Sequence, residues 1–512
     1  MQQYKKYLTC LLAATMLLVS CDKGFKDLNV NKVDPIALDP QIVMNDAVIL
    51  TVYPDNFGTL GMLCYNFPIV QQIVTPFGSS LSGGNYNIKN TANSPLVWTN
   101  FYQNVLKQNL DVITKTKTVP TLSNLYNQAR IWKAHSFMIL TDTYGDIPYT
   151  EAAQGFIGGI SYPKYDRQEA IYKDILKELD EATAALDPAK PSSANDILYG
   201  GNIVSWKKFG YSLLLRAAMR LTKVAPDVAK PYVTKAIAGG LMQSNADNAV
   251  IRHTSLYNNW IAVHLTAREK ANFYLAKPFL NFLKNNNDPR LNGIAYRAPG
   301  ATSGADQVPA KTTTDPTKQI GMPMGYDDVS IKNAFAADGV VSLYDYSQVN
   351  LNTVLSLTAP EYLVTYSETQ LLLAEAVVRT WATGDAATLY NNGVASHMRQ
   401  MADYGSAAAV SEANITAYLT AHPFDPAKAL EQINTQYWVS SFMNGSETWA
   451  NFRRSGFPAL TKNPYPGAEI TGSFIRRMPY PDGETIVNKA NLDAAVAAQG
   501  ANDLNTPVWW DK

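Results

Sequence analysis

The sequence predicts a mainly α fold: a tetratricopeptide-like array of helix pairs with long irregular loop insertions and a loop-rich C-terminal part. Two observations lead to this prediction. Apolar residues recur at three- and four-residue steps in several segments, and these segments follow one another in pairs. Between the pairs the chain is rich in Gly, Pro, Asn and Thr and keeps no period. Helix hairpins of about 34 residues with aromatic and small residues at their contacts are typical of tetratricopeptide arrays, although no unit here shows the full consensus.

The N-terminus is typical of an exported lipoprotein. Lys5 and Lys6 precede an apolar stretch that ends in Leu18-Val19-Ser20-Cys21, a run similar to a lipoprotein cleavage site. The stretch is about a dozen residues long, shorter than the roughly 20 that span a bilayer, so we expect residues 1–20 to be a signal peptide that is removed. Acyl chains on the thiol of Cys21 would then hold the protein at a membrane surface. The alternative is an ordinary secreted protein with an incidental cysteine.

Residues 21–40 are rich in Asp, Asn, Lys and Pro and predict a tether between the lipid and a single domain over 41–512. The sequence has 43 basic and 43 acidic side chains, and loss of two signal-peptide lysines changes the net charge only to −2. So balanced a chain favours neither nucleic acid nor an anionic membrane surface. Once Cys10 is removed and Cys21 is lipidated, only Cys64 remains, which excludes an intramolecular disulfide.

Three helix pairs are predicted, over residues 98–140, 166–240 and 361–403. The first joins Trp98–Lys117 to Leu122–Leu140, and Pro120 ends its first helix. The second joins Ala170–Leu186 to Val204–Leu221, with a shorter helix at Asp227–Ala238. The third joins Glu361–Thr380 to Asp385–Met401 through Gly384. Residues 248–358 are predicted to be a loop-rich insertion, and a helix at Ala427–Phe442 opens a C-terminal capping region over 427–512.

Aromatic side chains in the irregular stretches are the candidate ligand contacts. The chain has 29 Tyr and 9 Trp, and such rings offer an apolar face and a hydrogen-bonding edge, which suits sugar-like ligands. Long loops in compact domains commonly form binding surfaces. The candidates are Phe77, Tyr86, Trp98, Tyr257, Trp260, Tyr296 and Tyr326. Trp98 also begins a helix stripe, so for this residue core packing explains the pattern at least as well, and we expect some of the others to be buried supports for their loops.

No motif for catalysis is found. The five His include no pair four apart, and neither a Gly-x-Ser-x-Gly elbow nor a phosphate-binding Gly-Lys-Ser/Thr loop occurs. Asp142, Asp146 and Glu151 are near enough in sequence for acid/base work on a glycosidic bond, but helix capping and turns explain them better. We therefore expect no enzyme, cofactor or metal.

Two arginine pairs stand in the C-terminal part, Arg453-Arg454 and Arg476-Arg477. They could clamp an acidic ligand bidentately. The favoured interpretation is structural: they tie the C-terminal loops to helix C-termini and carboxylates of the helix pairs.

Several motifs in order resemble the SusD/RagB family, and more narrowly its starch-binding-associated outer-membrane branch. The similarity covers essentially the whole chain after the signal peptide. Its motifs are the cleavage site followed by Phe25-Lys26-Asp27-Leu28-Asn29-Val30-Asn31, then Leu140-Thr141-Asp142-Thr143-Tyr144-Gly145-Asp146-Ile147-Pro148-Tyr149, Leu372-Leu373-Ala374-Glu375-Ala376, Arg453-Arg454-Ser455-Gly456-Phe457-Pro458 and Pro507-Val508-Trp509-Trp510-Asp511.

The resemblance implies a lipoprotein exposed on the outer membrane of Bacteroidota-type bacteria. Such proteins cover a SusC-like TonB-dependent transporter, capture oligosaccharides or in some members peptides, and pass them on without breaking a bond. The motifs belong to the scaffold, so the site residues rest on the loop aromatics alone. A peptide-binding member, a surface glycoside hydrolase and a purely structural adaptor of the transporter stay open as alternatives.

Overall fold

The computed structural model describes residues 38–52 and 60–512. Cys21, the signal peptide and most of the predicted tether lie outside the described residues. The described chain is mainly helical, which confirms the predicted fold class. In that part of the chain, no helix combines the length and the apolar character that crossing a membrane requires.

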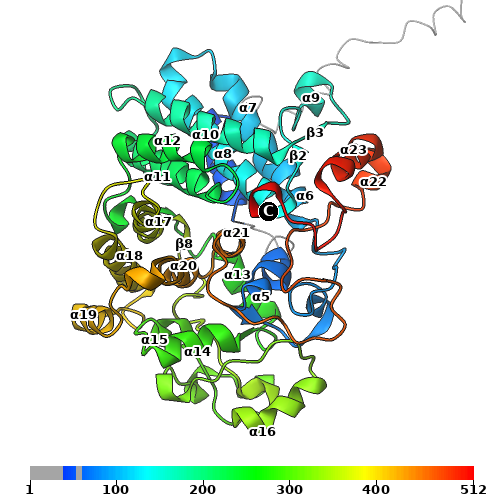
Figure 1. The fold of residues 1–512 in the computed structure, drawn as a ribbon, viewed down its shortest axis with the longest axis vertical. Helices are drawn as coiled ribbons and strands as arrows, with labels where there is room; N and C mark the ends of the chain where they lie inside the picture. Colours follow the sequence, from blue (N-terminus) through cyan, green and yellow to red (C-terminus); the bar gives the residue numbers. More distant parts are fainter. Residues whose placement is uncertain (1–37, 53–59) are drawn as a thin grey trace, which may run out of the picture.

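Helix pairs stack side by side to form the array (Figure 1). The three predicted pairs are α7/α8, α10/α11 and α17/α18, and α12 packs on α11. Neighbouring pairs contact each other through α8 and α10, and through α11 and α17. The bounds are α6 Leu96–Asn100, α7 Leu106–Thr116, α8 Ser123–Tyr144, α10 Gln168–Ala185, α11 Ile203–Arg220, α12 Pro226–Gly239, α17 Tyr366–Val378 and α18 Ala386–Gln400.

The helix ends follow local chemistry. Pro226 opens α12, where the missing N–H of proline costs nothing. At the end of α8, Gly145 has φ +86°, and a Cβ there would lie 2.0 Å from Oε1 of Gln499. Only glycine fits this position, so α8 stops there and the chain turns into residues 146–148, with Gln499 of the C-terminal part packed against the turn.

The third pair begins later than predicted. Glu361–Val364 is strand β8, which pairs antiparallel with β4 (Ala249–Ile251), and α17 starts only after Thr365. The side chain of Thr365 accepts a hydrogen bond from the N–H of Glu368 at 3.1 Å and caps the helix. The helical prediction for these four residues was therefore wrong, because a strand partner more than a hundred residues away holds them extended.

The C-terminal capping region contains a fourth helix pair, of which the sequence analysis predicted the first helix, at Ala427–Phe442, and missed the second. Helix α20 (Ala429–Ser440) packs on both α17 and α21 (Gly445–Ser455). The remaining C-terminal elements are α22 (Glu484–Val487), α23 (Lys489–Gln499) and a final 3-10 turn at Trp509–Asp511. The array thus extends beyond the predicted third pair.

The insertion is loop-rich, as predicted, but it also contains a nine-residue helix, α14 (Lys277–Asn285). Its sequence signal was Pro278 in the first turn, followed by the buried stripe Phe279, Leu280 and Leu283. The short elements of this and the flanking regions are α3 Pro40–Leu50, α5 Phe67–Ile69, α9 Gly155–Gly158, α13 Trp260–Val263, α15 Leu291–Ile294, α16 Phe335–Asp338 and α19 Glu412–Ala421. Two-stranded antiparallel ladders link β1 (Ile73–Val74) to β5 (Tyr274–Leu275), β2 (Ile147–Pro148) to β3 (Tyr165–Asp166) and β6 (Ala295–Tyr296) to β7 (Gln348–Val349).

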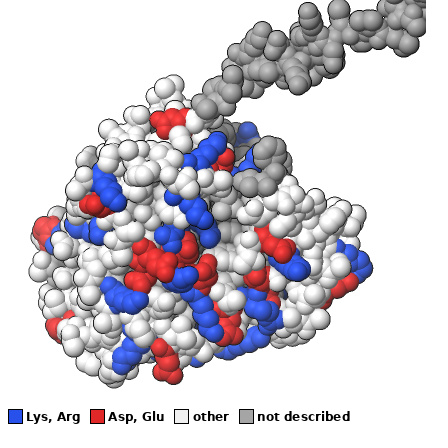
Figure 2. Space-filling view, turned by 90° about the horizontal axis from the view of Figure 1, so that it is seen from above, with Lys and Arg blue, Asp and Glu red and all other residues white. Residues whose placement is uncertain are grey.

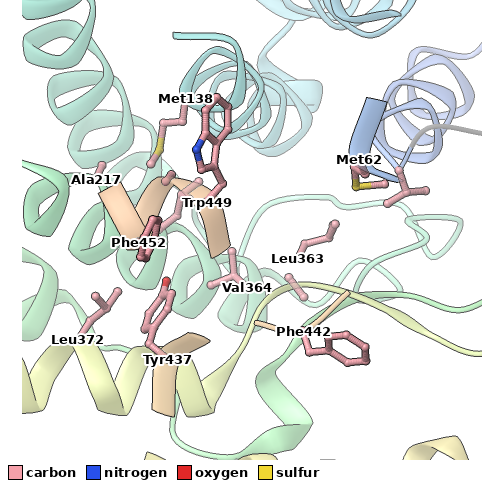
Figure 3. Packing of buried hydrophobic residues seen from close by; sticks show 14 of the residues in the cluster. Met62, Met138, Ala217, Leu363, Val364, Leu372, Tyr437, Phe442, Trp449 and Phe452 are labelled. Carbon is pink, nitrogen blue, oxygen red and sulfur yellow. The ribbon is translucent and has the colours of Figure 1, made fainter. Parts of the chain in front are cut away.

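Two hydrophobic clusters support the molecule. The large one is centred where α8, α11, α17, α20 and α21 meet, with Met138, Leu372, Tyr437 and Trp449 at its middle (Figure 3). The smaller one lies under the insertion and contains Val74, Tyr274, Met322, Ile331 and Tyr346. The insertion therefore has a packed base of its own.

Buried arginines tie the C-terminal segment to the helix array. Arg454 donates to both carboxylate oxygens of Glu375, at 2.6 and 2.7 Å. Burial alone would raise the pKa of Glu375, but the charges and hydrogen bonds of Arg454 and Arg379 lower that pKa to about 2. Arg477 donates to the carbonyl of Tyr144 at the end of α8, at 2.8 Å. These contacts confirm the structural interpretation of the arginine pairs.

Charges of both signs are interspersed on the face seen in Figure 2, without a large patch of one sign. Ion pairs along α10 illustrate the pattern: Arg130 lies 3.1 Å from Glu178, and Lys173 lies 2.7 Å from Glu169. This surface gives no electrostatic reason to bind a polyanion.

Candidate functional site

Three segments that are far apart in sequence meet and carry five aromatic side chains: two of the segments pack on the smaller hydrophobic cluster, and the third contacts both of them. We call this group the aromatic edge: Phe77, Tyr86, Tyr326, Tyr344 and Tyr465. Tyr86 and Tyr465 stack with ring centroids 3.7 Å apart and an angle of 2° between the planes. Phe77 and Tyr344 lie 6.5 Å apart, and both pack with Tyr326 against the smaller cluster. Four of the five rings are half-buried, and Tyr86 is the buried one.

Buried asparagines hold the first segment of the aromatic edge. Asn85 donates to the carbonyl of Ser80 at 2.8 Å and accepts from the N–H of Thr75 at 2.9 Å. Asn90 donates to the carbonyls of Ser79 and Ser82, at 2.8 and 2.7 Å. The loop that follows Phe77 thus has its backbone groups satisfied from within, which fixes its shape.

A third asparagine connects the segments. Asn463 is 4% exposed and donates to the carbonyl of Asn85 at 2.6 Å, while its Oδ1 accepts from the N–H of Tyr465 at 3.0 Å. Gly325 lies against the same side chain, with φ +84° and room for no Cβ, since one would lie 2.8 Å from Oδ1 of Asn463. This single amide therefore places Tyr465 over Tyr86 and holds the 325 turn beside both.

A carboxylate stands next to the stacked rings. Hydrogen bonds from Ser330, through its hydroxyl and its N–H, lower the pKa of Asp327, so this group is ionised at neutral pH. Burial and then the negative charge of Asp327 raise the pKa of Tyr86, which stays a neutral phenol. The aromatic edge thus combines ring faces with a charged hydrogen-bond acceptor.

Phe77, Tyr86 and Tyr326 are the predicted residues that the structure brings together here. Tyr344 and Tyr465 were missed as site residues. Tyr465 lies in Pro464-Tyr465-Pro466-Gly467, and an aromatic ring between two prolines in a loop is a signal that could have identified it.

Two further predicted contacts, Trp98 and Tyr296, are buried and lie outside the aromatic edge. Trp98 is 8% exposed and packs against Tyr102 and Tyr144, at centroid distances of 4.8 and 5.2 Å. Tyr296 is 5% exposed and lies in β6, where it pairs with Gln348.

Tyr257 and Trp260 belong to a separate group, in which Tyr257 precedes α13 and Trp260 is its first residue. Tyr257 stacks on His253 with centroids 5.1 Å apart, and Nε2 of His253 lies 2.8 Å from Oε2 of Glu361. Both rings are half-buried. They support this loop and do not join the aromatic edge.

The predicted turn around residues 141–149 is structural. Oδ1 of Asp146 accepts from the N–H of Gln168 at 2.8 Å and so caps α10. Asp142 is buried and accepts from Nε1 of Trp510 at 2.8 Å. The capping interpretation is confirmed, which removes these two carboxylates as an acid/base pair. Within residues 38–52 and 60–512, no group of three or more His, Cys, Asp or Glu is placed to hold a metal ion.

A sequence profile described as SusD-like, starch-binding associating with outer membrane, matches residues 42–481. The chain therefore belongs to the SusD-like family, as the sequence motifs indicate. No curated protein sequence matches it.

Solved structures agree with this assignment. A chitin-binding protein is 31% identical, with a TM-score of 0.82 over 93% of this chain and 100% of that chain. A Bacteroidetes SusD-like protein, AC2a, is 27% identical, with a TM-score of 0.81 over the same shares. A chitin-binding SusD homologue from Flavobacterium johnsoniae is 23% identical and shares the fold, with a TM-score of 0.76 over 92% of this chain and 99% of that chain.

Proposed function

We propose that this protein is a surface lipoprotein that captures oligosaccharides at the aromatic edge and passes them to a TonB-dependent outer-membrane transporter. The observation that carries the proposal is the set of half-exposed rings held by buried asparagines on a SusD-like scaffold. The family's starch-binding description and the chitin-binding relative at 31% identity support a glycan as the ligand.

The chemistry of the aromatic edge suits a sugar chain. The C–H face of a pyranose packs on an aromatic ring, and its hydroxyls can donate to the carboxylate of Asp327. Because Asn85, Asn90 and Asn463 fix the backbone, little conformational entropy is lost when a ligand binds. Release without chemistry fits transfer to a transporter.

Binding and catalysis are separated by one experiment. The protein is titrated with malto-oligosaccharides and chito-oligosaccharides in a calorimeter, and the same mixtures are analysed for new reducing ends. Heat without new products supports capture. New products would indicate a glycoside hydrolase. In a parallel titration with peptides, heat with peptides alone would indicate a peptide-binding member. The absence of heat with both sugars and peptides would indicate a structural adaptor.

The site is tested with Tyr465→Ala. Loss of a ring that stacks on the ligand should weaken oligosaccharide binding by more than about 1 kcal/mol. Tyr162→Ala is the matched control, because Tyr162 is 65% exposed and lies outside the aromatic edge. Equal affinities of the two variants would exclude the aromatic edge as the binding site.

The membrane anchor and the partner are tested separately. Cys21→Ala should abolish incorporation of labelled palmitate and release the protein from outer-membrane fractions. The wild-type protein should co-purify with a TonB-dependent transporter after mild solubilisation. Unchanged membrane association of the Cys21→Ala variant would contradict the lipid anchor.

A further inference from the structure

A surface cavity lies away from the aromatic edge. It has a volume of about 470 Å³ and opens between helix α19 and the turn that joins α14 to α15. This volume falls within the range of about 300 to 1,000 Å³ typical of small-molecule sites. In Figure 1, α19 lies at the left margin, across the molecule from the blue segment that carries the first part of the aromatic edge. The two places share no lining residue.

One face of α19 forms the first wall. Asn414, Ala417, Tyr418 and Ala421 follow at helical spacing and all line the cavity. The two alanines leave the space that larger side chains would fill. The opposite wall is the turn after α14, which contributes further amides from residues 286–292.

The two charged side chains in the lining are already engaged. Asp288 is held by Arg290, with Nε of Arg290 2.8 Å from Oδ1 and Nη2 2.5 Å from Oδ2. Lys284 donates to the carbonyls of Thr317 and Gln319, at 3.1 and 2.9 Å. The carboxylate of Asp288 is therefore paired with a guanidinium, and the ammonium of Lys284 points at two backbone carbonyls.

His422 supplies a defined acceptor. Its Nε2 lies 2.8 Å from the carbonyl oxygen of Asn286, and a carbonyl only accepts, so Nε2 carries the hydrogen. In the neutral imidazole, Nδ1 is then an acceptor. The ring of Tyr418 lies 4.5 Å from that of His422, which adds an apolar surface next to the polar groups.

The walls are tied together before any ligand arrives. Gln436 on α20 accepts from Nη2 of Arg290 at 2.8 Å and donates to the hydroxyl of Tyr418 at 3.0 Å. The contact between His422 and Asn286 joins the same two walls a second time. The cavity is thus built into the helix array and does not depend on a loop closing.

We propose that this cavity binds a short neutral carbohydrate of one or two sugar rings, independently of the aromatic edge. Amide groups both donate and accept, as sugar hydroxyls do, and the alanine and aromatic surfaces suit the C–H face of a pyranose. The lining has no unpaired carboxylate for a cation, because Asp288 is held by Arg290. The inference does not rest on the proposed function, since it uses a different set of residues.

The test uses the whole protein and four sugars: glucose, N-acetylglucosamine, maltose and N,N′-diacetylchitobiose. Ala417→Trp should fill the cavity and reduce the affinity for the best of these sugars about tenfold or more. Thr416→Trp is the matched control, because Thr416 is an exposed neighbour on α19 outside the lining and should leave the affinity unchanged. Asn414→Ala removes one exposed amide without adding bulk and should also weaken binding, which guards against misfolding of the tryptophan variant.

The outcomes separate this inference from the aromatic edge. Ala417→Trp should keep its affinity for long oligosaccharides, and Tyr465→Ala should keep its affinity for the short sugar. The inference is overturned when none of the four sugars binds the wild-type protein. Loss of short-sugar binding in Tyr465→Ala, with Ala417→Trp unaffected, would overturn it equally.

Discussion

The helix array and the aromatic edge use polar side chains in opposite ways. In the array, charged groups such as Arg454 and Glu375 are fully buried and bond to each other. At the aromatic edge, the side chains of the buried asparagines bond only to backbone, and four of the five rings stay half-buried. Changes in the array should therefore act on stability, whereas changes at the aromatic edge should act on binding.

This difference between buried ion pairs and half-buried rings also separates the family's motif residues from the candidate site. The motif residues Glu375 and Arg454 form a buried ion pair, and the motif residue Arg453 is buried and stacks on Trp449 at 3.8 Å. The aromatic edge contains none of the family motifs. The buried scaffold contacts therefore indicate that the chain belongs to the family, and they carry no information about which ligand it binds.

The largest expected effect is that of Arg454→Ala. It leaves Glu375 buried with only Arg379 as a charged partner, and breaking a buried ion pair costs about 3 to 5 kcal/mol of unfolding free energy. Denaturant titration measures this cost. A loss below about 1 kcal/mol would mean that water reaches the site and that burial does not govern the pair.

Acid should destabilise the protein through the same carboxylate. The pKa of Glu375 is about 2 in the folded protein against an ordinary value of 4.5, so its contribution is full above pH 4.5 and is lost as pH falls towards 2. The difference corresponds to about 3 kcal/mol. Unfolding free energies measured across this range should show a steeper fall for the wild-type protein than for Glu375→Gln, and parallel curves would contradict the assignment.

Asn463→Ala should lower both the unfolding free energy and the affinity for oligosaccharides, because this buried residue holds the aromatic edge together. It leaves the buried carbonyl of Asn85 without its donor, which costs about 1 to 3 kcal/mol, and it frees Tyr465 from its position over Tyr86. Oligosaccharide affinity should fall although Asn463 is 4% exposed. Calorimetry and denaturation measure the two effects, with Asn491→Ala as the control because Asn491 is a half-buried asparagine whose bond to the backbone of Tyr162 is exposed to solvent.

The smallest effect is expected for Arg399→Ala. Its bidentate pair with Glu412, at 2.7 Å for both bonds, is as short as that of Arg454, but both side chains are at least half exposed. Water screens such a pair, so neither the unfolding free energy nor glycan binding should change beyond experimental error. A large loss here would show that pairing geometry matters more than burial.

The sequence by itself determined the helices. The apolar stripes of α7, α8, α10, α11 and α18 are local, because a helix brings residues three and four apart onto one face whatever lies opposite. Pro120 and Gly384 marked connections for the same local reason. The missed helix α14 also carried a local signal in Pro278 and its apolar stripe.

Only the tertiary structure decided which rings stay at the surface. Phe77 and Trp98 both stand near the same irregular stretch, yet Trp98 packs in the core against Tyr144, whereas Phe77 stays half-buried beside Tyr344. Glu361–Val364 became a strand because β4 lies beside it. A side chain's exposure is set by what packs across from it, and that partner is distant in sequence, so local pattern carries no information about it.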